Sequence, residues 1–164
     1  MQSWGGSILR EDSDGSYHMW TAAFVGGCNL GGWQQNSQVV HAVSDTATGP
    51  FAFKDVALPV WHHGPQAVRA PDGTWMIFAR GKLNSSSVMC DRKTHRPICP
   101  GGHCTGNPGG QSVWLHASPS PNGPWRRIAP ICGGCDNAAP IFLPNGSLVV
   151  VYDDCTALHG RHFC

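Results

Sequence analysis

Short apolar runs alternate along the chain with turns rich in Gly, Pro, Asn and Asp. This pattern predicts many short strands rather than long helices. Three of the runs follow the same kind of turn, at 14–20 (DGSYHMW), 72–78 (DGTWMIF) and 145–152 (NGSLVVVY). Asp-Gly and Asn-Gly are strong hairpin signals, since a type I′ turn needs positive φ at both central positions. Each segment therefore predicts a β-hairpin.

Two further elements recur around these hairpins. A short strand that contains His41 or His116 runs into a polar turn that closes on Gly-Pro-aromatic, at 49–51 and 123–125. A third element, at 63–68 and 137–142, precedes the later hairpins. The offsets agree: 75 residues separate His41 from His116 and Pro65 from Pro140, and 73 separate Gly73 from Gly146. Because His41 and His116 recur, they are predicted to be structural.

Repeated units of about four short strands indicate an all-β fold of the β-propeller kind. The repeat length leaves room for only two to three blades, in one partial propeller domain over 1–164, with a Cys/Gly/Pro-rich loop insertion at 82–112. The alternative is a β-sandwich with unrelated hairpins, but sandwiches do not repeat three motifs in register. A propeller closes its ring to protect strand edges. We therefore expect the missing blades from a longer protein or from further copies.

Charge and composition narrow the partners. Charged residues make up 13% of the chain and the formal net charge is +1, so no feature indicates binding to nucleic acid or to an anionic membrane. No stretch approaches the roughly 20 apolar residues of a spanning helix. Eight cysteines favour an oxidising compartment, although no signal peptide is visible at the first residues. We expect a secreted protein whose leader lies upstream of this chain.

The ordered motifs together resemble five-bladed β-propellers of the glycoside hydrolase family 43 type. The resemblance covers most of the chain outside 82–112 and is carried by 4–7 (WGGS), 14–19, 36–44 (NSQVVHAVS), 48–51, 64–67 with 71–74, and 137–152. It implies hydrolysis of plant or algal polysaccharides, usually with inversion, by one carboxylic acid and one carboxylate. It also implies that these groups lie at the starts of the innermost strands, around the channel mouth, at 4–7, 62–66 and 136–140.

The resemblance leaves catalysis open. The general acid of such enzymes is a Glu, and the single Glu of this chain, Glu11, lies beside a turn. Asp136 is the candidate catalytic carboxylate, and the alternative is a turn or capping aspartate. We expect binding without efficient turnover, and no cofactor.

The candidate substrate-binding residues are polar or aromatic side chains near the predicted inner-strand starts and in neighbouring loops: Trp4, Trp33, His62, His63, Asn137 and Asp154. Tryptophan offers a flat apolar face for a sugar ring, and histidine can hydrogen-bond a hydroxyl. His62 and His63 are adjacent, so only one of them can face the channel. For His63 the alternatives are a metal ligand and a structural histidine, and for Asp154 the alternative is a solvated turn.

The cysteines admit two interpretations. The segment 132–135 (CGGC) has the spacing of half a zinc site, and Cys90, Cys99, His103 and Cys104 could form another. Disulfides that hold the long loop are favoured instead, so no metal is expected, although eight cysteines allow 105 pairings. Asn84 and Asn145 lie in N-glycosylation sequons.

The leading hypothesis is a secreted carbohydrate-active propeller module that binds or hydrolyses a polysaccharide at the channel mouth. A non-catalytic glycan-binding or structural extracellular glycoprotein is the alternative. An intracellular zinc-binding protein is a third hypothesis.

Overall fold

The structure is a computed structural model and describes residues 3–82, 87–98 and 112–154. Ten strands and two short helical turns form in these residues. They are β1 (Ser3–Arg10), β2 (Tyr17–Phe24), η1 (Leu30–Gly32), α1 (Trp33–Asn36), β3 (Ser37–Ser44), β4 (Ala52–Leu58), β5 (His62–Arg69), β6 (Trp75–Gly81), β7 (Ser112–Ser118), β8 (Arg126–Gly133), β9 (Cys135–Phe142) and β10 (Leu148–Asp154).

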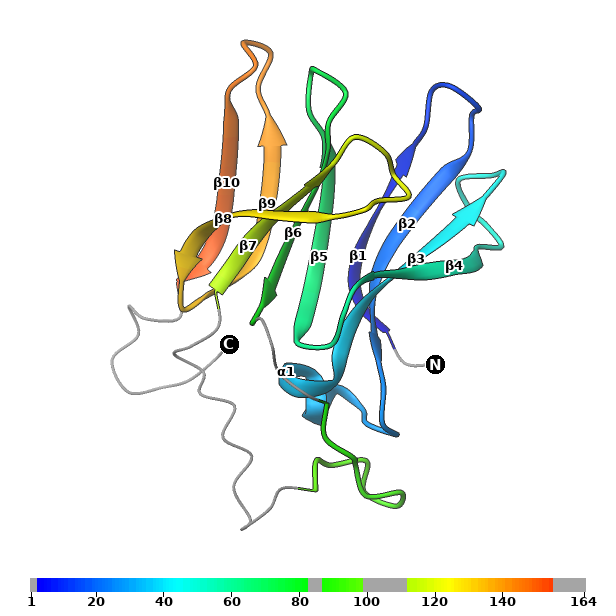
Figure 1. The fold of residues 1–164 in the computed structure, drawn as a ribbon, viewed down its shortest axis with the longest axis vertical. Coiled ribbons are helices and arrows are strands. Elements are labelled where there is room, and N and C mark those ends of the chain that lie inside the picture. Colours follow the sequence, from blue (N-terminus) through cyan, green and yellow to red (C-terminus); the bar gives the residue numbers. More distant parts are fainter. Residues whose placement is uncertain (1–2, 83–86, 99–111, 155–164) are drawn as a thin grey trace.

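The strands form three antiparallel sheets in chain order. Blade 1 is β1-β2-β3-β4, blade 2 is β5-β6-β7-β8, and the third sheet is the pair β9-β10. The first strands of successive sheets lie side by side, β1 next to β5 and β5 next to β9, while the later strands fan outward (Figure 1). This arrangement confirms the predicted partial β-propeller.

The predicted hairpins join β1 to β2, β5 to β6, and β9 to β10, all at one end of the sheets (Figure 1). The predicted turn type is wrong. Gly73 and Gly146 have φ of 88° and 83°, but the residue before each has negative φ. Ala70 N donates to Thr74 O at 2.8 Å and Gly73 N to Ala70 O at 2.9 Å, which is the pattern of a three-residue loop that ends on a left-handed glycine.

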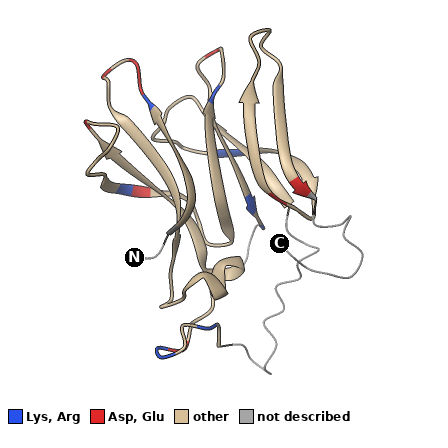
Figure 2. Cartoon of the chain, turned by 180° about the vertical axis from the view of Figure 1, so that it is seen from behind, with Lys and Arg blue, Asp and Glu red and all other residues tan. Residues whose placement is uncertain are grey.

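Two apolar layers separate the three sheets. Between blade 1 and blade 2, the buried side chains include Trp20, Trp75 and Ile77. Between blade 2 and the third sheet they include Phe78 and Val113. Lys, Arg, Asp and Glu lie mainly on turns and strand ends (Figure 2). The fold is therefore held by face-to-face packing of sheets, as in a propeller.

The repeat is in a slightly different register from the one predicted. Tyr17 pairs with Ser44 and Trp75 pairs with Ser118, so Ser44 and Ser118 are equivalent positions. His41 lies three residues before Ser44 (44 − 41 = 3), whereas His116 lies two before Ser118 (118 − 116 = 2). The two histidines therefore point to opposite faces of their blades and are not equivalent, although both are buried.

Two disulfides form in the described residues. Cys28–Cys90 joins the loop before α1 to segment 87–98, and Val88 N in this segment donates a 2.9 Å hydrogen bond to Asn36 Oδ1. Cys132–Cys135 links the end of β8 to the start of β9. Since these thiols are bonded to each other, the half zinc site proposed for 132–135 is wrong. Within the described ranges no helix is long and apolar enough to cross a membrane.

Gly81 is expected to be a sensitive position of blade 2. A Cβ there would lie 2.6 Å from His62 Cδ2 and 2.7 Å from the Trp61 carbonyl oxygen, whereas a Cβ on Gly133 would meet nothing within 4 Å. Gly81→Ala should lower the free energy of unfolding by about 1–3 kcal/mol through overpacking, and Gly133→Ala should change it little. Chemical denaturation of the two variants compares these effects. Equal losses would contradict the packing described here.

Candidate functional site

The starts of the three inner strands come together at the end of the sheets opposite the hairpins (Figure 1). Each start contains a left-handed residue, namely Gly5 (φ 63°), Gly64 (φ 56°) and Asn137 (φ 48°). In all three sheets the pairing register shifts at this point. A Cβ built on Gly5 would lie 3.6 Å from Gly64 Cα, and one built on Gly64 would lie 4.0 Å from Asn137 Oδ1. The three strands therefore approach one another at equivalent positions.

The residues that precede these left-handed positions are Trp4, His63 and Asp136. They are equivalent in the repeat and 73 residues apart in the second and third sheets (136 − 63 = 73), rather than 75. His63 and Asp136 are buried, whereas Trp4 is 53% exposed. The sequence-predicted Trp4, His63, Asp136 and Asn137 thus lie at the same end of the sheets.

Asp136 is held by a buried ion pair. Its Oδ2 accepts a hydrogen bond from Arg80 Nη1 at 2.5 Å, and its Oδ1 accepts one from the Asn137 backbone N–H at 2.9 Å. Arg80 comes from the end of β6, and its guanidinium lies 5.0 Å from the centre of the Trp33 ring. Both oxygens of this carboxylate therefore accept hydrogen bonds, one of them from a charged group.

His63 also contacts Trp33. The two ring centres are 4.8 Å apart, and His63 Nδ1 is 2.9 Å from Ser37 Oγ. Burial lowers the pKa of His63 to about 4; the Asp136 charge raises this pKa and the Arg80 charge lowers it, both less strongly. His63 is therefore neutral at neutral pH and can act as a hydrogen-bonding group.

The exposed rim of the site is formed by Asn137 and Asp153. Asn137 Nδ2 donates to Asp153 Oδ2 at 2.8 Å, and Asp153 pairs with Asp136 across β9 and β10. The predicted neighbour, Asp154, is in β10 opposite Cys135, but its side chain lies outside the described residues.

Other predicted residues lie elsewhere. His62 Nδ1 is 2.9 Å from the Pro59 carbonyl oxygen and its ring centre is 5.2 Å from that of His116, so it faces β7 instead of the cluster around Trp33. Asn145 is exposed on the β9–β10 turn, and Asn84 lies outside the described residues. Glu11 is buried at the β1–β2 turn, at the hairpin end.

Arg80 and Ser37 were not predicted from the sequence, and Asp153 was considered there only together with its neighbour Asp154, at the end of the apolar run 148–152. The only available signal for Arg80 was its position directly after the apolar run 75–79, where a cation at a strand end needs a partner. Nothing local pointed to Asp136 as that partner, since 56 residues separate the two.

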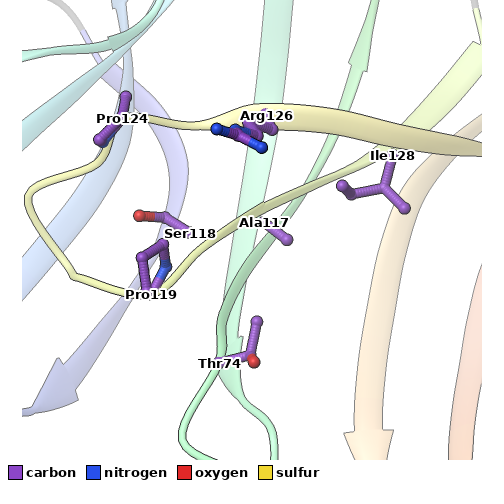
Figure 3. A pocket seen from close by; sticks show the side chains of 7 residues that line it. All are labelled: Thr74, Ala117, Ser118, Pro119, Pro124, Arg126 and Ile128. Carbon is purple, nitrogen blue, oxygen red and sulfur yellow. The ribbon is translucent and has the colours of Figure 1, made fainter.

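Two pockets lie at the hairpin end of the sheets, away from this cluster. One, of about 430 Å³, is lined by Thr74, the 117–119 segment, Pro124, Arg126 and Ile128 (Figure 3). The other, of about 530 Å³, lies between the β1–β2 turn and the turn 119–122.

Comparison with known proteins gives fold similarities only. No family model matches the sequence, and no curated protein matches it. Among solved structures, the chain is similar to an endo-1,4-β-xylanase from Bacteroides thetaiotaomicron (13% identity, 93% of this chain and 65% of that one, TM-score 0.39). It is also similar to a family 43 glycoside hydrolase from Bacillus licheniformis (12%, 92% and 53%, TM-score 0.40). An endo-1,5-α-L-arabinanase from Thermotoga petrophila matches at 14% identity over 92% of this chain and 53% of that one, with a TM-score of 0.39. The chain thus spans 53–65% of these three proteins.

Proposed function

We propose that this chain is a secreted glycan-binding propeller module that contacts a polysaccharide at the inner-strand starts. The observation that carries the proposal is the placement of three exposed residues, Trp4, Asn137 and Asp153, at the same end of the sheets. Trp4 offers an exposed aromatic face on β1, and Asn137 on β9 and Asp153 on β10 offer a hydrogen-bonded amide and carboxylate. A sugar ring can stack on a flat apolar face, and its hydroxyls can hydrogen-bond to amide and carboxylate groups.

The positions and partners of the carboxylates favour binding over hydrolysis. Inversion needs a protonated acid and a carboxylate base about 6.5–9.5 Å apart. Asp136 is engaged by Arg80 and Glu11 lies at the hairpin end, so neither is available as the acid. The disulfides Cys28–Cys90 and Cys132–Cys135 support an oxidising, extracellular compartment.

Binding to a panel of plant and algal polysaccharides tests the proposal by titration calorimetry. Trp4→Ala should weaken binding to the best ligand about tenfold, which is the loss expected for one stacking contact. Phe53→Ala is the matched control, since Phe53 is 62% exposed on β4 of blade 1 and outside the site. Release of reducing ends is measured in parallel and is expected to stay at background. The proposal fails if no polysaccharide binds, or if both variants bind like the unaltered chain.

A further inference from the structure

The outward face of blade 1 repeats a face that is buried in blade 2. Counting from the left-handed residues Gly5 and Gly64, Ile8 is equivalent to Ala67; counting from the turn glycines, Met19 is equivalent to Ile77. Ala67 and Ile77 form the layer that packs on blade 1. Ile8 is 45% exposed and, with Met19 and Thr21, lines an open pocket of about 420 Å³.

The outward face of the third sheet repeats the opposite face in the same way. Trp20, Phe78 and Val151 each lie five residues after their turn glycine. Trp20 packs toward blade 2 and Phe78 toward the third sheet, and both are fully buried. Val151 is 64% exposed, and its neighbours on this face, Ile141 and Val149, are 57% and 39% exposed.

We propose that a second copy of this chain docks head to tail on the first copy. The outward face of blade 1 in the second copy, formed by Ile8, Met19 and Thr21, packs on the outward face of the third sheet in the first copy. That third-sheet face is formed by Ile141, Val149 and Val151. They are the repeat equivalents of faces that already pack between blade 1 and blade 2, where Trp20 and Leu9 meet Ala67 and Ile77. The interface is thus a further copy of one that the chain itself contains, and burying exposed apolar side chains drives it.

The association also extends the inner-strand surface. Within the chain β1 lies beside β5 and β5 beside β9, so the second copy's β1 would lie beside β9 of the first. Trp4 of the second copy would then adjoin Asn137 of the first. Two copies would arrange six sheets around one axis, within the usual range of about four to eight. The docking does not depend on glycan binding.

Sedimentation and light scattering of the full chain test the docking. The unaltered chain should have twice the monomer mass of 17.6 kDa. Val151→Glu and Ile8→Glu should each give monomers, because each places a charge in one of the two faces. An equimolar mixture of these variants should recover a dimer, since the intact face of each variant matches the intact face of the other. Ile98→Glu is the control, an exposed apolar residue outside both faces, and should remain dimeric.

Circular dichroism of each variant verifies that the fold is kept, which is expected because the altered side chains are exposed. A monomeric unaltered chain would overturn the proposal and would mean that other polypeptide covers these faces. A dimer that neither variant disrupts, or a mixture that remains monomeric, would overturn the head-to-tail arrangement.

Discussion

Replacing Arg80 with methionine is expected to lower the free energy of unfolding by about 3–5 kcal/mol, since it leaves Asp136 as a buried carboxylate without its charge partner. Both side chains are almost fully buried, with 2% and 7% of their surfaces exposed. Water cannot replace the lost guanidinium, so the desolvation cost of the carboxylate is no longer offset. Denaturant unfolding of Arg80→Met measures the loss.

Arg69→Met is the matched control, because it makes the same chemical change at another interblade ion pair. Arg69 lies 3.4 Å from Glu11 and 3.1 Å from Asp12, but its side chain is 34% exposed and solvent screens the pair. Its loss should be below about 1 kcal/mol. The double variant Arg80→Met with Asp136→Leu should recover most of the stability, since no buried charge remains. If Arg80→Met costs no more than Arg69→Met, then Asp136 is not the buried, dependent carboxylate described here.

The parts of the fold that could be predicted from the sequence are those set by local chemistry. Asp-Gly and Asn-Gly before apolar runs located the hairpins at 14–20, 72–78 and 145–152, and their recurrence indicated blades. The turn type was wrong because a left-handed glycine also ends a three-residue loop, and the dipeptide alone does not distinguish the two.

Register and pairing could not be predicted, because they depend on contacts between distant segments. His41 and His116 looked equivalent by spacing, but the strand pairing places them one position apart. The ion pair between Arg80 and Asp136 joins separate sheets, and neither residue carries a local signal for the other. Of the two adjacent aspartates at the end of β10, the sequence could not show that Asp153 is the one that reaches Asn137.

Acid is expected to destabilise the fold well before the carboxylates are protonated. Burial lowers the pKa of both His63 and His116 to about 4, from an ordinary value of 6.5. Above pH 6.5 these rings are neutral in the folded and the unfolded chain, so they add no pH dependence. Between pH 6.5 and about 4 the two rings are protonated in the unfolded chain but stay neutral in the folded chain. The free energy of unfolding therefore decreases as the pH is lowered through this window. Each ring should account for about 3 kcal/mol over this window.

Other groups reinforce the direction of this effect within the same window. Burial also lowers the pKa of His18 and His41, and His18 Nδ1 lies 2.8 Å from His41 Nε2, so two protonated rings cannot keep this contact.

The turn carboxyls Asp14 and Asp72 affect stability only at lower pH. Hydrogen bonds from Ser16 and Thr74 hold their pKa values below 3.8, so their contribution is lost only in stronger acid.

The measurement is the free energy of unfolding of the unaltered chain and of His63→Gln at a series of pH values from neutral to about pH 4. Glutamine keeps a hydrogen-bonding group near Ser37 but cannot bind a proton, so this variant should lose about 3 kcal/mol less stability across the window. His95→Gln is the control, because it makes the same substitution at an exposed position on segment 87–98. A stability that stays constant from neutral pH to about 4 would contradict the neutral, buried state of these rings, and so would a His63→Gln profile parallel to that of the unaltered chain.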